Sequence, residues 1–247
     1  MGSIVGNLQE VKRRIAGACA GAGRSAELHT QAPPPENPPE NLREAGVTLL
    51  AVSKTFNAQA VRQAFAAGQR AFGENYVQEA LAKIEALTDL RAQLQWHLIG
   101  PLQSNKTRPV AEAFDWVHSI DRLKVAQRLS EQRPPQLPPL QVCLQVNISQ
   151  EFSKAGFAPA DVPAAALAVA ALPRLVLRGL MAIPEPAADL AAQRAPHRAL
   201  RELMARLNAS GLQLDTLSMG MSADLEAAVA EGATLLRVGS AIFGTRA

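Results

Sequence analysis

Short apolar runs alternate with amphipathic runs along most of the chain, from residue 47 to residue 238. The apolar runs have the length of buried strands, and the amphipathic runs repeat with helical spacing. The predicted strands cover residues 47–53, 70–73, 94–100, 116–120, 140–147, 176–183, 216–220 and 235–238. The predicted helices between them cover residues 58–67, 76–87, 106–113, 123–131, 163–171, 189–210 and 223–230. A further amphipathic helix is predicted at the start of the chain, where Ile4, Leu8, Val11 and Ile15 recur at helical spacing.

Eight predicted strands that alternate with helices favour a parallel sheet with right-handed crossovers. The chain has 247 residues, a length typical of a (β/α)8 barrel. We therefore predict the α/β class and a single (β/α)8 TIM barrel over residues 1–247. An open doubly wound sheet is the alternative. No G-x-G-x-x-G motif follows the first predicted strand, which argues against a dinucleotide site.

Residues 26–46 interrupt the pattern before the first of these strands. They contain Pro33, Pro34, Pro35, Pro38 and Pro39 among polar residues. Such a segment buries little apolar surface, so we expect an exposed, mobile insertion rather than a proline-rich docking motif. Because it precedes a strand, the insertion should emerge at the amino ends of the strands. We therefore expect it to leave a site at the carboxyl ends unperturbed.

Composition excludes several classes of protein. The net charge is only +3, and aromatic residues make up 4% of the chain. The basic residues are dispersed, so we expect no nucleic-acid partner. Two cysteines, Cys19 and Cys143, lack metal-ligand spacing, which predicts no metal site and a reducing, cytoplasmic location. No apolar run is long enough to span a membrane, and we expect no secretory signal.

The carboxyl ends of barrel strands share one face, where active sites lie. Lys54 ends the first apolar run, LLAVSK. An amine is costly to bury unless it is used, and a lysine of lowered pKa forms Schiff bases with carbonyl compounds. A lysine at a strand end also commonly extends to solvent. From Lys54 alone, both interpretations stay open.

Two turns after the last strands suit a phosphate. Ser222 precedes the helix predicted at 223–230, and Gly239-Ser240 starts a second turn. Backbone N–H groups at such turns bind anions, although Ser222 could simply cap its helix. Arg237, inside an apolar strand, needs either an internal carboxylate or a ligand. We interpret His97 and His118 as core residues.

Six motifs occur in order along the chain. They are residues 49–54 (LLAVSK), 72–76 (FGENY), 96–106 (WHLIGPLQSNK), 178–183 (RGLMAI), 218–224 (SMGMSAD) and 237–244 (RVGSAIFG). With them, nearly the whole chain apart from the insertion closely resembles the pyridoxal phosphate homeostasis protein family. The resemblance implies a barrel related to the N-terminal domain of alanine racemase, with pyridoxal 5′-phosphate (PLP) as its cofactor.

The resemblance also implies roles for individual residues. Lys54 would hold PLP as an internal aldimine, and Ser222, Gly239 and Ser240 would hold the phosphate. Arg237 would face the pyridine nitrogen. The remaining residues expected at the cofactor are Asn75, Met181 and Ser218.

The implied function is intracellular PLP homeostasis by storage, buffering and delivery, with transient contacts to apo PLP enzymes and no strong catalysis. Arginine beside the pyridine nitrogen would keep that atom unprotonated and make PLP a poor electron sink. Tyr76 is the only tyrosine, so the second base of a two-base racemase is expected to be missing. An amino-acid racemase and a PLP-free Schiff-base barrel such as an aldolase remain as alternatives. We expect a monomer.

Overall fold

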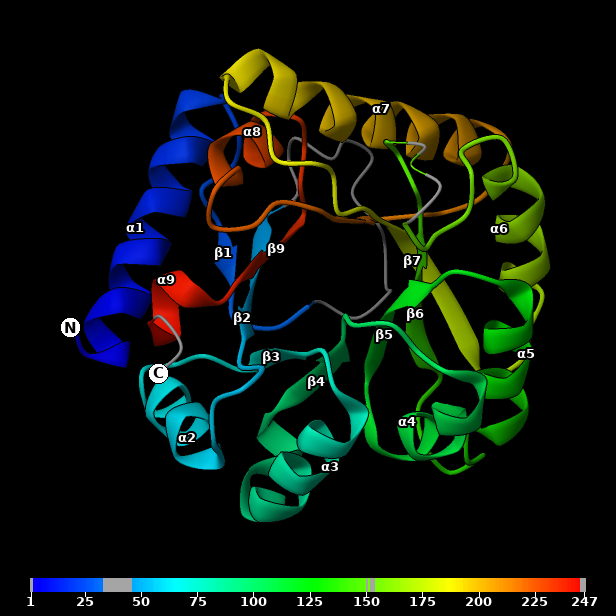
Figure 1. Cartoon of the computed structure of the whole chain (residues 1–247), viewed down its shortest axis with the longest axis horizontal. Coiled ribbons are helices and arrows are strands. Elements are labelled where there is room, and N and C mark those ends of the chain that lie inside the picture. Colours follow the sequence, from blue (N-terminus) through cyan, green and yellow to red (C-terminus); the bar gives the residue numbers. More distant parts are fainter. Residues whose placement is uncertain (1, 33–45, 150, 152–153, 245–247) are drawn as a thin grey trace.

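The structure is a computed structural model that describes residues 2–32, 46–149, 151 and 154–244. Parallel strands form a ring that helices surround (Figure 1). The strands are β1 (Leu28–His29), β2 (Val47–Val52), β3 (Ala71–Glu74), β4 (Gln95–Leu98), β5 (Trp116–Ile120), β6 (Leu140–Gln145), β7 (Leu175–Met181), β8 (Thr216–Ser218) and β9 (Leu235–Val238).

Pairing between β2 and β9 closes the sheet. Thr48, Leu49, Leu50 and Ala51 lie opposite the four residues of β9, and every other strand pairs with its neighbour in sequence. The eight strands β2 to β9 therefore form a closed parallel barrel. The predicted (β/α)8 barrel is confirmed, and the open doubly wound sheet is wrong.

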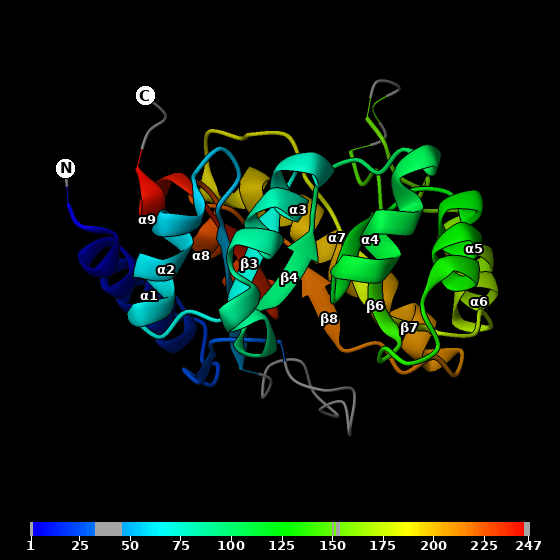
Figure 2. The same cartoon turned by 90° about the horizontal axis from the view of Figure 1, so that it is seen from below.

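Helices lie outside the strands on all sides, as the view along the barrel and the view from below both show (Figures 1 and 2). They are α1 (Ile4–Gly21), α2 (Ala58–Ala66), α3 (Val77–Ala86), α4 (Thr107–Ala113), α5 (Leu123–Gln132), α6 (Val162–Ala170), α7 (Leu190–Ala209), α8 (Leu225–Ala230) and α9 (Ser240–Phe243), with 3-10 turns at Thr88–Gln93 and Ser104–Lys106. The local sequence determines where some of these helices begin. The Asn57 and Asp189 side chains accept backbone N–H groups at the starts of α2 and α7.

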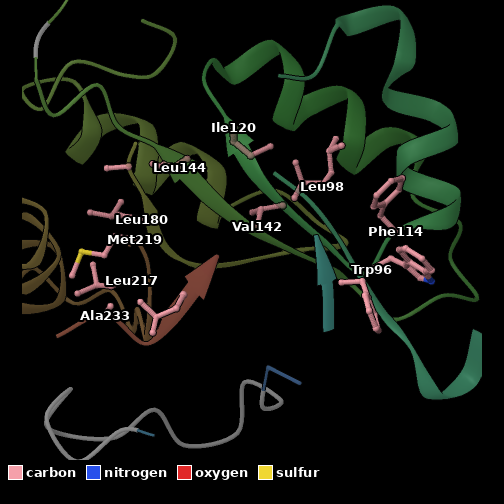
Figure 3. Close-up of a cluster of buried hydrophobic side chains, with 14 of the residues drawn as sticks. Trp96, Leu98, Phe114, Ile120, Val142, Leu144, Leu180, Leu217, Met219 and Ala233 are labelled. Atoms are coloured by element: carbon pink, nitrogen blue, oxygen red, sulfur yellow. The ribbon is translucent and has the colours of Figure 1, made fainter. Parts of the chain in front are cut away.

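The larger core lies between the strands and the helices. Every residue of β2 is buried, as expected for a parallel strand that is covered on both faces. Figure 3 shows buried side chains of several strands that belong to this layer, among them Leu98 of β4, Val142 of β6 and Leu180 of β7. Inside the barrel, one small cluster contains Leu50, Val52, Ala71, Ile99 and Leu235. A second contains Ala32, Trp116, Cys143 and Met181. The barrel interior is therefore packed rather than hollow.

The first part of the predicted insertion is only partly exposed, because Leu28, His29 and Thr30 are half-buried and Ala32 is buried. Leu28 and His29 form β1, which pairs with the start of β2. The Thr30 carbonyl accepts the backbone N–H groups of Arg70 and Ala71, and Ala32 is buried inside the barrel. The amino ends of the strands offer backbone donors that this segment satisfies, a pairing that composition does not reveal. Residues 33–45, which hold the prolines, lie outside the described residues.

The segment from Leu28 to Ala32 does enter at the amino ends of the strands, as expected. In the described part of the chain, no helix combines the length and apolar character that crossing a membrane requires.

Candidate functional site

A cavity of about 550 Å³ opens at the carboxyl ends of the strands. Its volume is in the range of small-molecule sites. Six of the eight residues predicted to bind the cofactor line it: Lys54, Asn75, Ser222, Arg237, Gly239 and Ser240. The structure thus brings together residues from both ends of the chain.

Lys54 follows β2, and the residues on either side of it are fixed by β3 and α3. The Ser53 hydroxyl donates to Oε1 of Glu74 at 2.6 Å, and the Ser53 carbonyl accepts from Nζ of Lys83 at 2.7 Å. The backbone N–H of Thr55 donates to Oε1 of Glu79 at 2.6 Å. Thr55 has a φ of 69°, a left-handed conformation that is costly for a β-branched residue. These contacts hold the turn that presents Lys54 to the cavity.

Glu74, Glu79 and Lys83 together form what we call the lysine clamp. Lys83 Nζ lies 2.7 Å from Oε1 of Glu74 and 2.6 Å from Oε1 of Glu79. With the Ser53 carbonyl, it has three acceptors, which matches the three N–H donors of an ammonium. Glu74 is fully buried, and this burial raises its pKa while Lys83 opposes the shift. The clamp is thus a buried network whose cation is fully satisfied.

Arg237 lies in β9 and is 4% exposed. Its Nη1 donates to Oγ of Ser218, and its Nη2 donates to the carbonyl of Ala182, both at 2.9 Å. Burial lowers the pKa of Arg237 to about 10, and nearby Asp224 opposes the shift. The group therefore stays cationic at neutral pH. None of the ion pairs found among the described residues includes Arg237, so neutral acceptors, not an internal carboxylate, hold it.

Two turns form another wall of the cavity. Ser222 and Ala223 come from the turn between β8 and α8, and Gly239 and Ser240 come from the turn after β9. Among the described residues, the backbone N–H groups of Ser222 and Ala223 make no hydrogen bond within the protein. Such N–H groups suit an anion.

Ser222 does not cap α8, contrary to one interpretation of the sequence. The residue at that position is Asp224, and the helix begins at Leu225. Instead, Oδ1 of Asp224 accepts a hydrogen bond from the Met221 backbone N–H, and Oδ2 of Asp224 lies 2.9 Å from Nε2 of His197. The Ser222 carbonyl accepts from Nη1 of Arg14 at 2.8 Å, so helix α1 helps to hold this turn.

Met181 and Ser218 do not line the cavity, in contrast to the expectation for them. Both are completely buried. Met181 packs with Trp116 and Cys143 inside the barrel, and Ile183, two residues further along, reaches the cavity instead. Side chains two residues apart point to the same face of a strand. Met181 and Ile183 therefore share a face, but Met181 lies inside the barrel and only Ile183 reaches the cavity. Ser218 lies behind Arg237 as its acceptor.

Sequence reasoning missed the apolar part of the lining. These residues are Val52, Phe56, Ile99, Ile183, Met221, Ala223 and Gly244. Apolar residues at strand ends carry no chemical signal, although strand periodicity identifies Ile183 once Met181 is placed inward. The lining also contains an unsatisfied polar atom, because Oδ1 of Asn75 is buried without a hydrogen-bond partner. A bound polar molecule would satisfy it.

Tyr76, adjacent to Asn75, is 55% exposed and is not among the lining residues. Among the described residues, the cavity therefore contains no tyrosine.

Comparisons with known proteins show the family of the chain. The family described as alanine racemase, N-terminal domain, matches residues 40–247. The pyridoxal phosphate homeostasis protein of Pseudomonas aeruginosa is 59% identical over 246 residues, which cover 100% of this chain and 97% of that protein. The protein of the same name from Escherichia coli K12 is 49% identical over 247 residues and covers 100% of this chain and 98% of its own length.

Solved structures give the same result. PipY of Synechococcus elongatus, solved with PLP bound, is 42% identical, with a TM-score of 0.74 over 93% of this chain and 100% of that chain. Alanine racemase of Corynebacterium glutamicum shares the fold at 18% identity, with a TM-score of 0.60 over 79% of this chain and 55% of that chain. The chain belongs to the pyridoxal phosphate homeostasis protein family, whose barrel is that of the alanine racemase N-terminal domain.

Proposed function

We propose that this protein binds PLP in the cavity through Lys54 and acts as a PLP store and donor in the cell. One observation carries the proposal: a single cavity contains a lysine, a buried arginine with neutral partners, and two turns suited to a phosphate. The unsatisfied Oδ1 of Asn75 adds an unused polar partner in the same lining. PLP, when bound, supplies an aldehyde that condenses with a primary amine.

Each residue then has a defined task. Lys54 supplies the amine, on a turn that the lysine clamp fixes. Ser222, Ala223, Gly239 and Ser240 hold the phosphate through backbone N–H groups and hydroxyls. Arg237 places a permanent cation at the cavity wall, which disfavours a proton on any ring nitrogen that lies against it.

Storage is favoured over catalysis for two reasons. A cofactor ring that cannot gain a proton is a weak electron sink, so the cavity gives little help to carbanion formation. Racemisation by two bases needs an acid–base group on each face of the substrate, and the only tyrosine, Tyr76, is exposed and is not among the residues that line the cavity. We propose the cytoplasm as the compartment, because Cys19 and Cys143 are both free thiols.

Visible absorption tests the binding. Purified protein incubated with PLP and then desalted should carry a yellow band. Sodium borohydride should reduce the imine, bleach this band and leave the cofactor covalently attached to Lys54. The Lys54→Ala variant should lose the band and the covalent adduct but keep its fold by circular dichroism. Lys106, half-buried after β4 and outside the cavity lining, offers a control, and Lys106→Ala should keep the band. A colourless wild-type protein would refute the proposal.

Transfer tests the biological role. Loaded protein should activate an apo PLP enzyme faster than an equal total amount of PLP in the presence of a phosphatase that destroys the free cofactor. If activation tracks only spontaneous release, the protein buffers PLP without delivering it. Turnover of alanine or other amino acids at rates typical of racemases would overturn the non-catalytic assignment.

A further inference from the structure

A line of polar side chains, all buried except the half-buried Gln95, runs from the cofactor cavity through the barrel to the amino ends of the strands. Arg237 Nη1 lies 2.9 Å from Oγ of Ser218, which lies 2.7 Å from Nδ1 of His118. His118 Nε2 lies 2.9 Å from Nδ1 of His97, and His97 Nε2 lies 2.9 Å from Oε1 of Gln95. We call these five residues the interior chain. Only Arg237 reaches the cavity lining.

At each end of the interior chain, the role of hydrogen-bond donor or acceptor is fixed. Arg237 can only donate, because a guanidinium has no acceptor. At the other end, Oε1 of Gln95 accepts the backbone N–H of Ala32 at 2.8 Å, and Nε2 of Gln95 faces the Ala32 carbonyl at 3.3 Å. A flipped Gln95 amide would set two donors against each other. Gln95 therefore presents an oxygen, an acceptor, to His97.

These ends leave one arrangement of protons for neutral rings. His97 must donate from Nε2 to Gln95, so its Nδ1 is an acceptor. His118 must then donate from Nε2, which leaves its own Nδ1 to accept the Ser218 hydroxyl proton. Ser218 thus turns its oxygen lone pairs toward Arg237. Each hydrogen bond that links two residues of the interior chain is therefore donated in the direction away from the cavity.

The surroundings keep both rings neutral. His97 and His118 are completely buried, and His97 stacks on Trp116 with centroids 5.2 Å apart and planes at 12°. The Arg178 guanidinium lies over the Trp116 ring, 4.8 Å from its centroid. Burial lowers the pKa of His118 to about 3, helped by Arg237, and lowers that of His97 well below its usual value. A doubly protonated ring is thus excluded near neutral pH.

We propose that His118 and His97 are positioning residues for the cofactor site. They are locked as neutral Nε2–H tautomers, which fixes Ser218 as a hydrogen-bond acceptor and so holds the Arg237 guanidinium at the cavity wall. The inference rests on the proposed PLP site for its functional consequence, while the tautomers are a property of the protein alone.

Arg237 requires such support because of its surroundings. A buried guanidinium without a carboxylate partner depends on neutral acceptors, and here these are Oγ of Ser218 and the Ala182 carbonyl. A backbone carbonyl is fixed by the sheet, but a serine hydroxyl can rotate and offer its proton instead. His118 removes that freedom by accepting the proton. Two of the five guanidinium N–H donors are thereby occupied, and the remaining donors are available to a ligand.

Nitrogen NMR on the cofactor-free protein tests the tautomers directly. Long-range 1H–15N correlations should show both rings in the neutral Nε2–H form between pH 6 and 8. A protonated ring, or a ring carrying its proton on Nδ1, would overturn the inference. This result does not depend on PLP, so it separates a failure of the interior chain from a failure of the proposed function.

Binding measurements test the positioning role. His118→Phe and Ser218→Ala should each weaken PLP binding about tenfold, as the loss of one hydrogen bond to a charged group predicts. Ser119→Ala is the matched control, since Ser119 is also a buried serine but donates to the Gly100 carbonyl, outside the interior chain. It should leave PLP binding unchanged.

A double-mutant cycle shows whether His118 acts through Arg237. In the Arg237→Gln background, His118→Phe should cause little further loss of affinity, because the effects of residues in one network are not additive. An equal loss in both backgrounds would mean that His118 has only a structural role, which would refute the proposal. If a variant does not fold, the NMR measurement on the wild-type protein still decides the proton arrangement.

Discussion

Lys54 and Arg237 line one cavity because the first and last strands of the barrel pair directly, with Leu50 of β2 opposite Arg237 of β9. The structure supports the two side chains in different ways. Hydrogen bonds to the lysine clamp fix the turn around Lys54. Arg237 is held by two neutral oxygens, Oγ of Ser218 and the Ala182 carbonyl. The site thus combines a presented amine with a permanent cation.

Arg14 should matter for phosphate binding although it lies on α1. It donates to the Ser222 carbonyl and pairs with Glu226 at 2.5 and 2.6 Å, so it fixes the Ser222 turn from behind. Arg14→Met should weaken PLP binding about two- to fivefold, as the loss of a partly exposed ion pair predicts, and should keep the visible band. Equilibrium titration measures this.

Arg13→Met is the matched control for Arg14→Met. Arg13 is exposed, and within the part of the chain that the structure describes it pairs only with Glu10, one turn away. An equal effect of the two substitutions would show that charge, rather than the Ser222 turn, is responsible.

Lys83→Met should be strongly destabilising. The substitution leaves Glu74 buried without its cation and frees the Ser53 carbonyl. Breaking one partner of a buried pair costs about 3–5 kcal/mol. Urea denaturation of the wild type, Lys83→Met and the exposed control Lys124→Met measures the difference. A loss below about 1 kcal/mol would show that the lysine clamp is not a stabilising network.

Stability should fall as the pH drops from 6.5 toward 5. The pKa of His118 is depressed to about 3 in the folded protein, so the unfolded chain takes up a proton in this range and the folded protein does not. Each such histidine removes up to about 1.4 kcal/mol of unfolding free energy per pH unit. Denaturation at pH 7, 6 and 5 should therefore give a shallower decline for His118→Phe. Identical slopes would contradict the depressed pKa.

Gly179 should not tolerate a side chain. A Cβ there would lie 1.8 Å from the Thr216 carbonyl oxygen, so Gly179→Ala must push β7 and β8 apart. We expect a loss of about 3 kcal/mol or more. At Gly17, in α1, a Cβ meets nothing within 4 Å, and Gly17→Ala should stabilise by about 0.5–1 kcal/mol. Thermal unfolding of both variants checks the opposite signs.

The barrel was predictable because strand-length apolar runs alternate with helical runs without ambiguity. Each of the eight strands 47–53 to 235–238 was found near its observed bounds. The two-residue β1 was missed, since a strand of that length has no periodicity to detect. Its partner strand and the buried Ala32 are long-range features that no local pattern encodes.

The site was predictable where chemistry marks a residue. Lys54, Arg237 and the two turns carry charge or turn-forming residues at strand ends, and all of them reach the cavity. The sequence does not show how deep a residue lies along a strand. Met181 was therefore expected at the cofactor cavity, whereas it is packed inside the barrel. His97 and His118 are core residues as interpreted, but their joining into one chain depends on β4 and β5 being neighbours in the sheet.

Barrel closure also sets the order of events during synthesis. A growing chain presents Lys54 early, but Ser222, Arg237 and Ser240 leave the ribosome only with the last strands. Until β9 pairs with β2, the part of the cavity wall that contains Ser222, Arg237 and Ser240 is missing. Cofactor binding is therefore a late event in the synthesis and folding of the chain. A chain that holds its cofactor has already closed its barrel.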